Sequence, residues 1–118
     1  EFRATVLSRY DRRCPVSGVD HADLLDVAHI LPWSDFPDQR SDPSNVWALS
    51  KLHHAAFDRD LFTVDRDYRL RTNPSFETEC EFLEETITDR SGERIQALQE
   101  RIDPEYLQRR NSGVEWLD

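Results

Sequence analysis

The chain has 118 residues, with 24 acidic against 15 basic side chains and a net charge of −9. No apolar run approaches the ~20 residues of a membrane span and no signal segment opens the sequence, so we expect one soluble, cytoplasmic domain over residues 1–118. The two cysteines, Cys14 and Cys80, form no CxxC pair, which excludes a zinc ribbon within this chain and argues against a disulfide framework.

The first predicted elements follow from the spacing of apolar residues. Residues 2–11 carry them at helical intervals, which predicts an N-terminal helix that ends at a turn containing Pro and Gly. A short apolar run over residues 24–30 is typical of a strand, and residues 46–49 predict a second strand. The loop between them, residues 34–44, is rich in Asp, Pro and Ser, which favour turns.

The second half of the chain predicts a hairpin followed by helices. Residues 63–72 alternate around a polar tip, which is typical of a β-hairpin. Residues 78–86 fit a strand or a helix. The leucine and isoleucine spacing over residues 91–102 predicts a short helix, and an Asp-Pro pair marks the start of another over residues 105–110. This C-terminal part carries no chemical motif, so we expect it to complete the core.

The chemistry-bearing side chains concentrate in residues 26–62, which hold three of the four histidines. His29 closes the first predicted strand, and Asn45 ends the loop that follows. His54 and Asp58 are four residues apart and therefore share one face of a helical turn. The order is strand, loop, strand and helix, with imidazoles at both ends. Such an arrangement can hold a metal ion against a general base.

These residues resemble the signature of the HNH nucleases. The ordered match extends over residues 2–64 and is similar to the group that reads AHI..PW, then N, then HH..FD. The resemblance implies an α+β fold with a ββα-metal core, joined by an N-terminal helix, a following hairpin and C-terminal helices. It also implies a metal-dependent endonuclease that hydrolyses phosphodiester bonds in DNA. The segments that carry it are Ala28-His29-Ile30, Asn45 and His53-His54-Ala55-Ala56-Phe57-Asp58.

The resemblance also assigns roles within the site. His29 is the general base, a role that suits histidine because the side chain exchanges protons near neutral pH. His54, also counted among the catalytic residues, binds one divalent cation together with Asp58. One nitrogen and one carboxylate suit Mg²⁺, Mn²⁺, Zn²⁺ or Ni²⁺, so the metal identity stays open. Asn45 either holds the loop so that His29 stays in register or supplies an oxygen ligand, and we favour the positioning role.

The sequence departs from the family at Ala28, where many HNH enzymes have a metal-binding Asp or His. Asp26 lies two residues back on the same strand face and could replace that ligand. Otherwise water and DNA oxygens complete the coordination shell. Ala28 also supports a rival function, a catalytically silent nucleic-acid- or protein-binding module that keeps the fold and a structural metal.

Other conspicuous residues have simpler interpretations. Cys14 is expected to be a small buried apolar residue, and His21 to be a solvated loop residue. We expect His53 to be a buried hydrogen-bonding partner and Trp33 to pack either in the core or within the loop. Asp58, instead of binding metal, could pair with a nearby arginine.

The acidic balance is unusual for a protein that binds DNA. Either the partner is not nucleic acid, or acidity is a trait of the whole surface, as in salt-adapted proteins. A single lysine against fourteen arginines, with Asp in excess over Glu, is similar to the composition of a salt-loving archaeon. In the second case the arginines must cluster where DNA docks instead of pairing with carboxylates. The candidates for DNA binding are Arg40, Arg59, Arg69 and Arg71.

The resemblance extends to partners as well. In restriction enzymes, nuclease domains of this kind often follow a separate DNA-reading module. We therefore expect DNA as the substrate and no membrane partner. We also expect either a homodimer or a separate DNA-recognition domain to supply sequence specificity.

Overall fold

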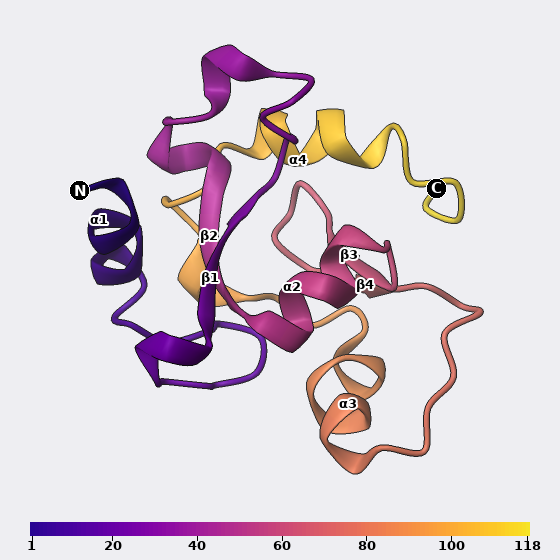
Figure 1. Ribbon diagram of the computed structural model, residues 1–118. Helices are drawn as coiled ribbons and strands as arrows, with labels where there is room; N and C mark the ends of the chain where they lie inside the picture. Colours follow the sequence, from indigo (N-terminus) through magenta and orange to yellow (C-terminus); the bar gives the residue numbers. More distant parts are fainter.

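The computed structural model describes residues 1–118 and contains four α-helices and two antiparallel two-stranded sheets. Strands β1 (Leu25–His29) and β2 (Val46–Ser50) run side by side through the middle of the molecule, with helix α1 (Phe2–Arg9) to one side of them (Figure 1). Helix α2 (Lys51–Asp58) follows β2 without a loop. The mixed helix and hairpin architecture is the predicted α+β fold with a ββα unit at its centre.

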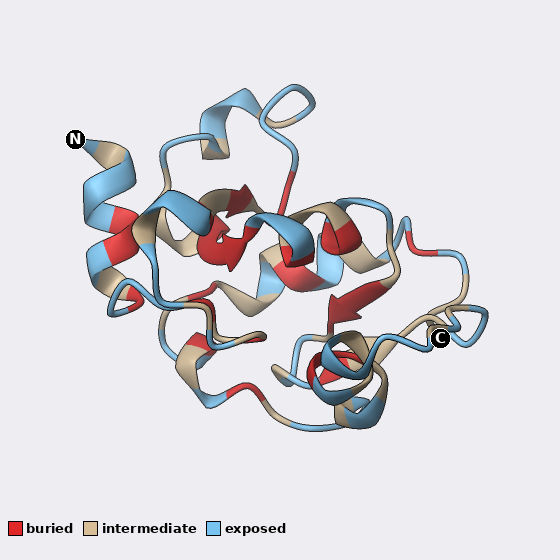
Figure 2. Cartoon of the chain, turned by 60° about the horizontal axis from the view of Figure 1, so that its bottom comes forward, coloured by how far each residue is buried: buried red, intermediate tan, exposed pale blue.

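The β1–β2 pair forms the centre of the hydrophobic core. Its register places His29 opposite Val46, and every residue of β2 is buried. Figure 2 shows buried residues on the strands and on parts of the helices, while much of the loop surface is exposed. Trp47 of β2 packs edge-on against Phe57 of α2, with ring centroids 5.3 Å apart, so the strand pair and the helix share one core.

Local chemistry explains where α2 begins and where α1 ends. The Ser50 side chain accepts a hydrogen bond from the backbone N–H of His53, so the last residue of β2 is also the N-cap of α2. Helix α1 ends earlier than predicted, because Asp11 and Arg12 adopt positive φ angles of 56° and 54° and cannot continue a right-handed helix.

The remaining elements surround this centre. The predicted hairpin is confirmed as β3 (Phe62–Val64) and β4 (Leu70–Thr72). The ambiguous segment 78–86 contains helix α3 (Glu81–Thr86). The last predicted helix is confirmed as α4 (Pro104–Asn111), which Asp103 caps by accepting a hydrogen bond from the Glu105 N–H. None of the helices has the length and apolar content needed to cross a membrane.

The helix predicted over residues 91–102 is wrong. Only a three-residue 3₁₀ turn, Gln96–Leu98, lies in that stretch. The backbone instead pairs with the β3–β4 hairpin, through Gly92 N–H to Leu70 C=O at 2.7 Å and Ile95 N–H to Tyr68 C=O at 2.8 Å. The apolar side chains at helical spacing are buried, but the segment that carries them is irregular. Pairing with the hairpin therefore determines the backbone here, and not the helical spacing of the sequence.

The long loop between β1 and β2 is tied to α4. The Tyr106 hydroxyl donates a hydrogen bond of 2.6 Å to the Asp42 carboxylate, which also accepts from the Ser44 N–H. The bond to Asp42 raises the pKa of Tyr106 to about 12, and the same bond keeps the pKa of Asp42 below its usual range. The loop thus has one fixed point on a helix 64 residues further along the chain.

Replacing Tyr106 with Phe removes this bond. We expect the free energy of unfolding at neutral pH to fall by about 1 kcal/mol, because the bond is charge-assisted but partly solvated. Since the pKa of Tyr106 is raised from 10.0 to about 12, the bond stabilises fully below pH 10 and is lost between pH 10 and 12. Urea denaturation of both proteins should show their difference shrinking across that window. A difference that stays constant up to pH 12 would contradict this account.

Candidate active site

A cleft of about 480 Å³ opens where the end of β1, the start of the long loop and α2 meet. It brings together three predicted site residues that are far apart in the sequence, His29, His54 and Asp58. Val27 and His29, two residues apart, point to the same face of β1 and form one wall. The lining residues are Val27, His29, Pro32, Trp33, Ser34, His54, Asp58 and Arg110.

The orientation of the His29 ring is set by one backbone group. Its Nε2 lies 3.0 Å from the carbonyl oxygen of Arg40. A carbonyl can only accept a hydrogen bond, so Nε2 carries the proton and donates it. Nδ1 of His29 then keeps its lone pair and has no hydrogen-bond partner within the chain. The ring is therefore held in the tautomer that can accept a proton at Nδ1.

The Asn45 side chain is fully buried and is bonded to the start and to the middle of the long loop. Its Oδ1 accepts from the Leu31 N–H at 2.9 Å, and its Nδ2 donates to the carbonyls of Leu31 at 3.2 Å and Gln39 at 3.1 Å. Gln39 directly precedes Arg40, whose carbonyl holds the His29 ring. This geometry supports a positioning role for Asn45, because the amide is used within the loop and does not line the cleft.

On the opposite wall, the His54 ring lies between two carboxylates. Its Nδ1 is 2.9 Å from Oδ2 of Asp26, and its Nε2 is 3.1 Å from Oδ2 of Asp58. A neutral imidazole has one N–H, so it can donate to only one of them. If Nδ1 donates to Asp26, the Nε2 lone pair and the Asp58 carboxylate face each other at the cleft. Two electron-rich groups at that distance need a proton or a cation between them.

Asp26 is not positioned to replace the metal ligand that is missing at Ala28. Its second oxygen, Oδ1, accepts from the Lys51 ammonium at 2.6 Å, so both oxygens are used. Partial burial raises the pKa of Asp26, but the hydrogen bonds from Lys51 and His54 outweigh it and leave that pKa below its usual value. Asp26 does not line the cleft, and Ala28 is fully buried. Asp26 therefore acts on the site through His54.

The residues at the cleft fit a weakly held divalent cation. No group of three or more His, Cys, Asp or Glu side chains in the chain is arranged to hold a metal ion. The available set is the pair His54 and Asp58, one nitrogen and one carboxylate. Ions such as Mg²⁺ are commonly bound by one or two carboxylates together with water and substrate phosphates. The pair suits that mode, and water and substrate would supply the other oxygens.

His53 is the buried hydrogen-bonding partner that the sequence predicts. Thr86 uses its hydroxyl proton on the Phe82 carbonyl, so its oxygen, 2.8 Å from Nε2 of His53, must accept. Ser50, 2.8 Å from Nδ1, then donates to that nitrogen. Burial lowers the pKa of His53 to about 4, so the ring is neutral under ordinary conditions. Its role is to join α2 to α3.

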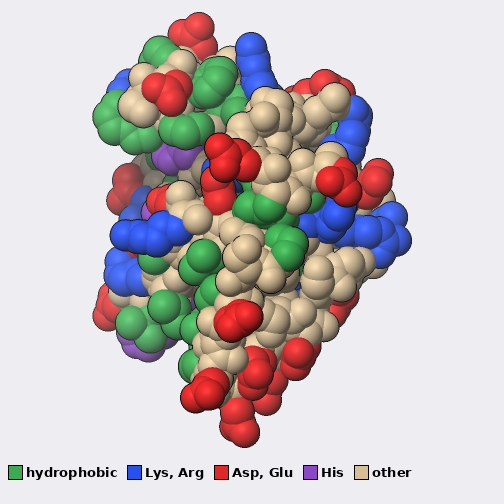
Figure 3. Space-filling view, turned by 90° about the vertical axis from the view of Figure 1, so that its right-hand side faces the viewer, with side chains coloured by type: hydrophobic (Ala, Val, Ile, Leu, Met, Phe, Trp, Pro, Cys, Tyr) green, Lys and Arg blue, Asp and Glu red, His purple; other side chains and the backbone are tan.

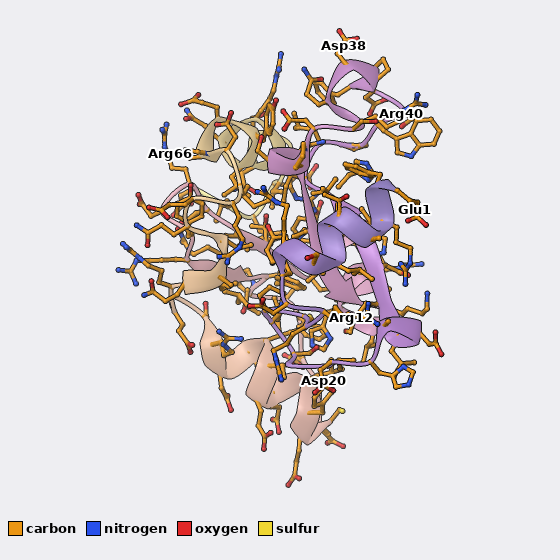
Figure 4. All side chains as sticks on the ribbon, turned by 90° about the vertical axis from the view of Figure 1, so that its left-hand side faces the viewer. Glu1, Arg12, Asp20, Asp38, Arg40 and Arg66 are labelled. Atoms are coloured by element: carbon orange, nitrogen blue, oxygen red, sulfur yellow. The ribbon has the colours of Figure 1, made fainter.

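Of the two packing roles expected for Trp33, the structure excludes the core and is compatible with the loop. Its side chain is 51% exposed and forms part of the cleft wall, because the loop leaves the core after Leu31. The Arg40 guanidinium lies 5.4 Å from the centre of the indole ring. Figure 4 shows Arg40 and Asp38 close together on this loop, with Arg66 of the β3–β4 turn on the other side of the view. Trp33 and Arg40 together form the rim of the cleft.

The other three arginines predicted to contact DNA do not line the cleft. Arg71 is 3.4 Å from the Asp65 carboxylate, which is the pairing foreseen as the alternative to clustering. Arg69 donates to the carbonyl of Gly92, and Arg59 to that of Ala55. On the face shown in Figure 3, acidic side chains gather toward one end while basic ones form smaller groups at the sides.

Sequence reasoning also missed Arg110, a charged residue that lines the cleft. It lies on α4, and its side chain is only 10% exposed. Burial lowers the pKa of Arg110, and the charges of Asp60 and Asp58 oppose that effect. No local pattern marks it, since it reaches the site only through long-range packing.

Comparison with known proteins gives one informative match. No curated protein matches the chain. Residues 14–65 match the family model described as HNH endonuclease. That segment contains β1, the long loop, β2 and α2, and therefore also His29, Asn45, His54 and Asp58 in the order found at the cleft. Over this segment, which carries the residues of the cleft, the chain is similar to the HNH endonuclease family.

Proposed function

We propose that this chain is a metal-dependent endonuclease that hydrolyses phosphodiester bonds in DNA, as the nuclease domain of a restriction-type enzyme. The observation that carries the proposal is the pair of groups facing one cleft. One wall holds His29, whose Nδ1 has no hydrogen-bond partner within the chain, and the other holds His54, whose Nε2 lies beside the Asp58 carboxylate. Hydrolysis needs a base for the attacking water and positive charge on the phosphate, which these walls would supply separately.

His29 would act as the general base. Its Nδ1 would take a proton from the attacking water, while the bond from Nε2 to the Arg40 carbonyl keeps the ring from turning. Asn45 would support this step indirectly, because its three bonds fix the loop that carries that carbonyl. The base and its support thus come from the strand and loop side of the cleft.

His54 and Asp58 would hold the divalent cation, and their one nitrogen and one carboxylate suit Mg²⁺, Mn²⁺, Zn²⁺ or Ni²⁺. When bound, such an ion supplies Lewis-acid stabilisation of the phosphate and the leaving oxygen. Asp26 would keep the Nδ1 proton of His54 in place, so that Nε2 presents its lone pair to the cleft. Lys51 would in turn hold Asp26.

The substrate contacts are proposed from charge and position. Arg40 is the predicted DNA-binding residue nearest the cleft, because it lies against Trp33 of the cleft wall. Arg59, Arg69 and Arg71 would contribute only at the periphery. Sequence specificity would then come from a second copy of the chain or from a separate DNA-recognition domain.

One observation favours a second candidate function. The position where many family members have a further metal ligand is Ala28, which is buried and has no donor atom. The chain could therefore be a silent binding module that keeps the fold. Metal-dependent cleavage by the purified protein separates the two candidates.

The main test replaces His29 with Ala. Removing a general base should lower the rate of plasmid nicking by on the order of 10²–10⁴-fold, with folding and metal binding retained. His21→Ala, an exposed histidine outside the cleft, is the matched control and should cut at the wild-type rate. EDTA should stop the wild-type reaction. Cleavage by His29→Ala at the wild-type rate would remove His29 from the mechanism, and no cleavage by wild type with any of the four metals would favour the silent module.

A second test concerns the cation. His54→Ala and Asp58→Ala should each raise the metal concentration needed for half-maximal nicking, since each removes one of two protein donors. Asp26→Asn should have a smaller effect in the same direction, because it acts through His54. Calorimetric titration of Mn²⁺ into the protein checks binding directly, with the exposed Asp89→Ala variant as control. Unchanged affinity in His54→Ala would show that the metal site lies elsewhere.

A third test separates the two roles considered for Asn45. Asn45→Ala leaves buried backbone groups of Leu31 unpaired, so we expect the free energy of unfolding to fall by about 3 kcal/mol. Asn73→Ala removes comparable bonds in a partly exposed loop and should cost no more than about 1 kcal/mol. Under conditions where Asn45→Ala stays folded, its nicking rate should fall while its Mn²⁺ affinity stays the same. A weakened Mn²⁺ affinity would instead identify Asn45 as a ligand.

A further inference from the structure

The Arg110 side chain forms hydrogen bonds to the backbone of both walls of the cleft. One terminal nitrogen, Nη1, donates to the carbonyl of Ile30 at 3.3 Å. The other, Nη2, donates to the carbonyl of Phe57 at 2.7 Å and to the Asp60 carboxylate at 3.1 Å. The guanidinium carbon lies 3.7 Å from the centre of the Phe57 ring. The acceptors belong to segments that lie 80 and 53 residues away in the sequence.

The two carbonyls have a specific relation to the site. Ile30 directly follows His29, and Phe57 directly precedes Asp58. One planar guanidinium therefore holds the backbone next to the proposed base and the backbone next to the proposed metal ligand. The β1–β2 ladder also ties Asp26 and His29 to β2, but the pairing ends at Ser50 and does not reach the C-terminal end of α2.

The burial of Arg110 is hard to explain by its contribution to the free energy of unfolding alone. The Arg110 side chain is 10% exposed, and its Nε has no hydrogen-bond partner. A buried charge with an unsatisfied donor adds little stability compared with apolar packing of the same volume. What the guanidinium offers is a rigid fork with donors at fixed positions, which can span two carbonyls at once.

We propose that Arg110 is a positioning residue of the site, which sets the separation of His29 and Asp58 by clamping the ends of β1 and α2 together. The proposal rests on the nuclease function proposed above. The clamp acts through the backbone, so it requires the forked shape of arginine and not only its charge. A lysine at this position keeps the charge but offers a single ammonium group, which cannot reproduce both bonds in the same plane.

The test compares Arg110→Met and Arg110→Lys with Arg101→Met. Arg101 is a matched control, because its guanidinium also donates to two backbone carbonyls, those of Arg9 and Ala97, and also lies over an aromatic ring, that of Tyr10, but it does not line the cleft. Both Arg110 variants should lose on the order of 10²-fold in kcat for plasmid nicking, with KM little changed. Arg101→Met should retain the wild-type kcat even where its Tm falls as much.

Hydrogen exchange of the metal-free proteins gives an independent measurement. Loss of the clamp should raise amide exchange in residues 28–31 and 57–60 together in Arg110→Met, beyond any general rise seen in Arg101→Met. Recovery of kcat in Arg110→Lys, or a change confined to KM, would overturn the clamp and indicate a charge that contacts the phosphate. Unchanged exchange in both segments would also overturn it. If wild type does not cut DNA, the nuclease function fails, and the exchange result alone decides whether the clamp exists.

Discussion

The site depends first on the buried side chain of Asn45. This one amide bonds Leu31 at the start of the long loop and Gln39 further along it, while its own backbone carbonyl accepts from the Ile30 N–H at 2.8 Å. The loop is exposed for much of its length and has little core of its own, so its path is set by these bonds and by the anchor to Tyr106. Because the Arg40 carbonyl is part of that path, a buried polar group in the loop determines the tautomer at the cleft surface.

The two walls of the cleft are built by different means. The base side is a strand end and a loop held by hydrogen bonds to backbone groups. The metal side is a helix whose position is set by packing, through Phe57 against Trp47, and by the buried, neutral His53 that links it to α3. Asp26 and Lys51 cross from the strand to the helix and hold His54. Each wall is therefore rigid by itself, and their separation depends on the few contacts that cross between them.

Sequence reasoning recovered what local spacing encodes. The order of His29, Asn45, His54 and Asp58 lies within a short segment, where strand and helix periods fix which side chains share a face. It could not recover Arg110, because nothing in residues 104–111 indicates that one arginine of α4 reaches a carbonyl 80 residues away. The helix predicted for residues 91–102 was wrong for a related reason. An irregular segment that pairs with a hairpin can bury apolar side chains at the same intervals as a helix does. Asp26 was found, but its partners depend on where α2 docks.

The net charge of −9 is a weaker guide to the partner than the pairing of individual arginines. Arg71 faces Asp65 and Arg66 faces Glu105, so part of the positive charge is neutralised within the chain. Arg40 lies on an exposed loop against an indole ring and forms no ion pair, which leaves its charge available at the cleft rim. Binding to a phosphate backbone depends on such local charges and on the counterions they release. A cleft with so few of them can orient one phosphate, and most of the affinity for DNA would have to come from surfaces outside it.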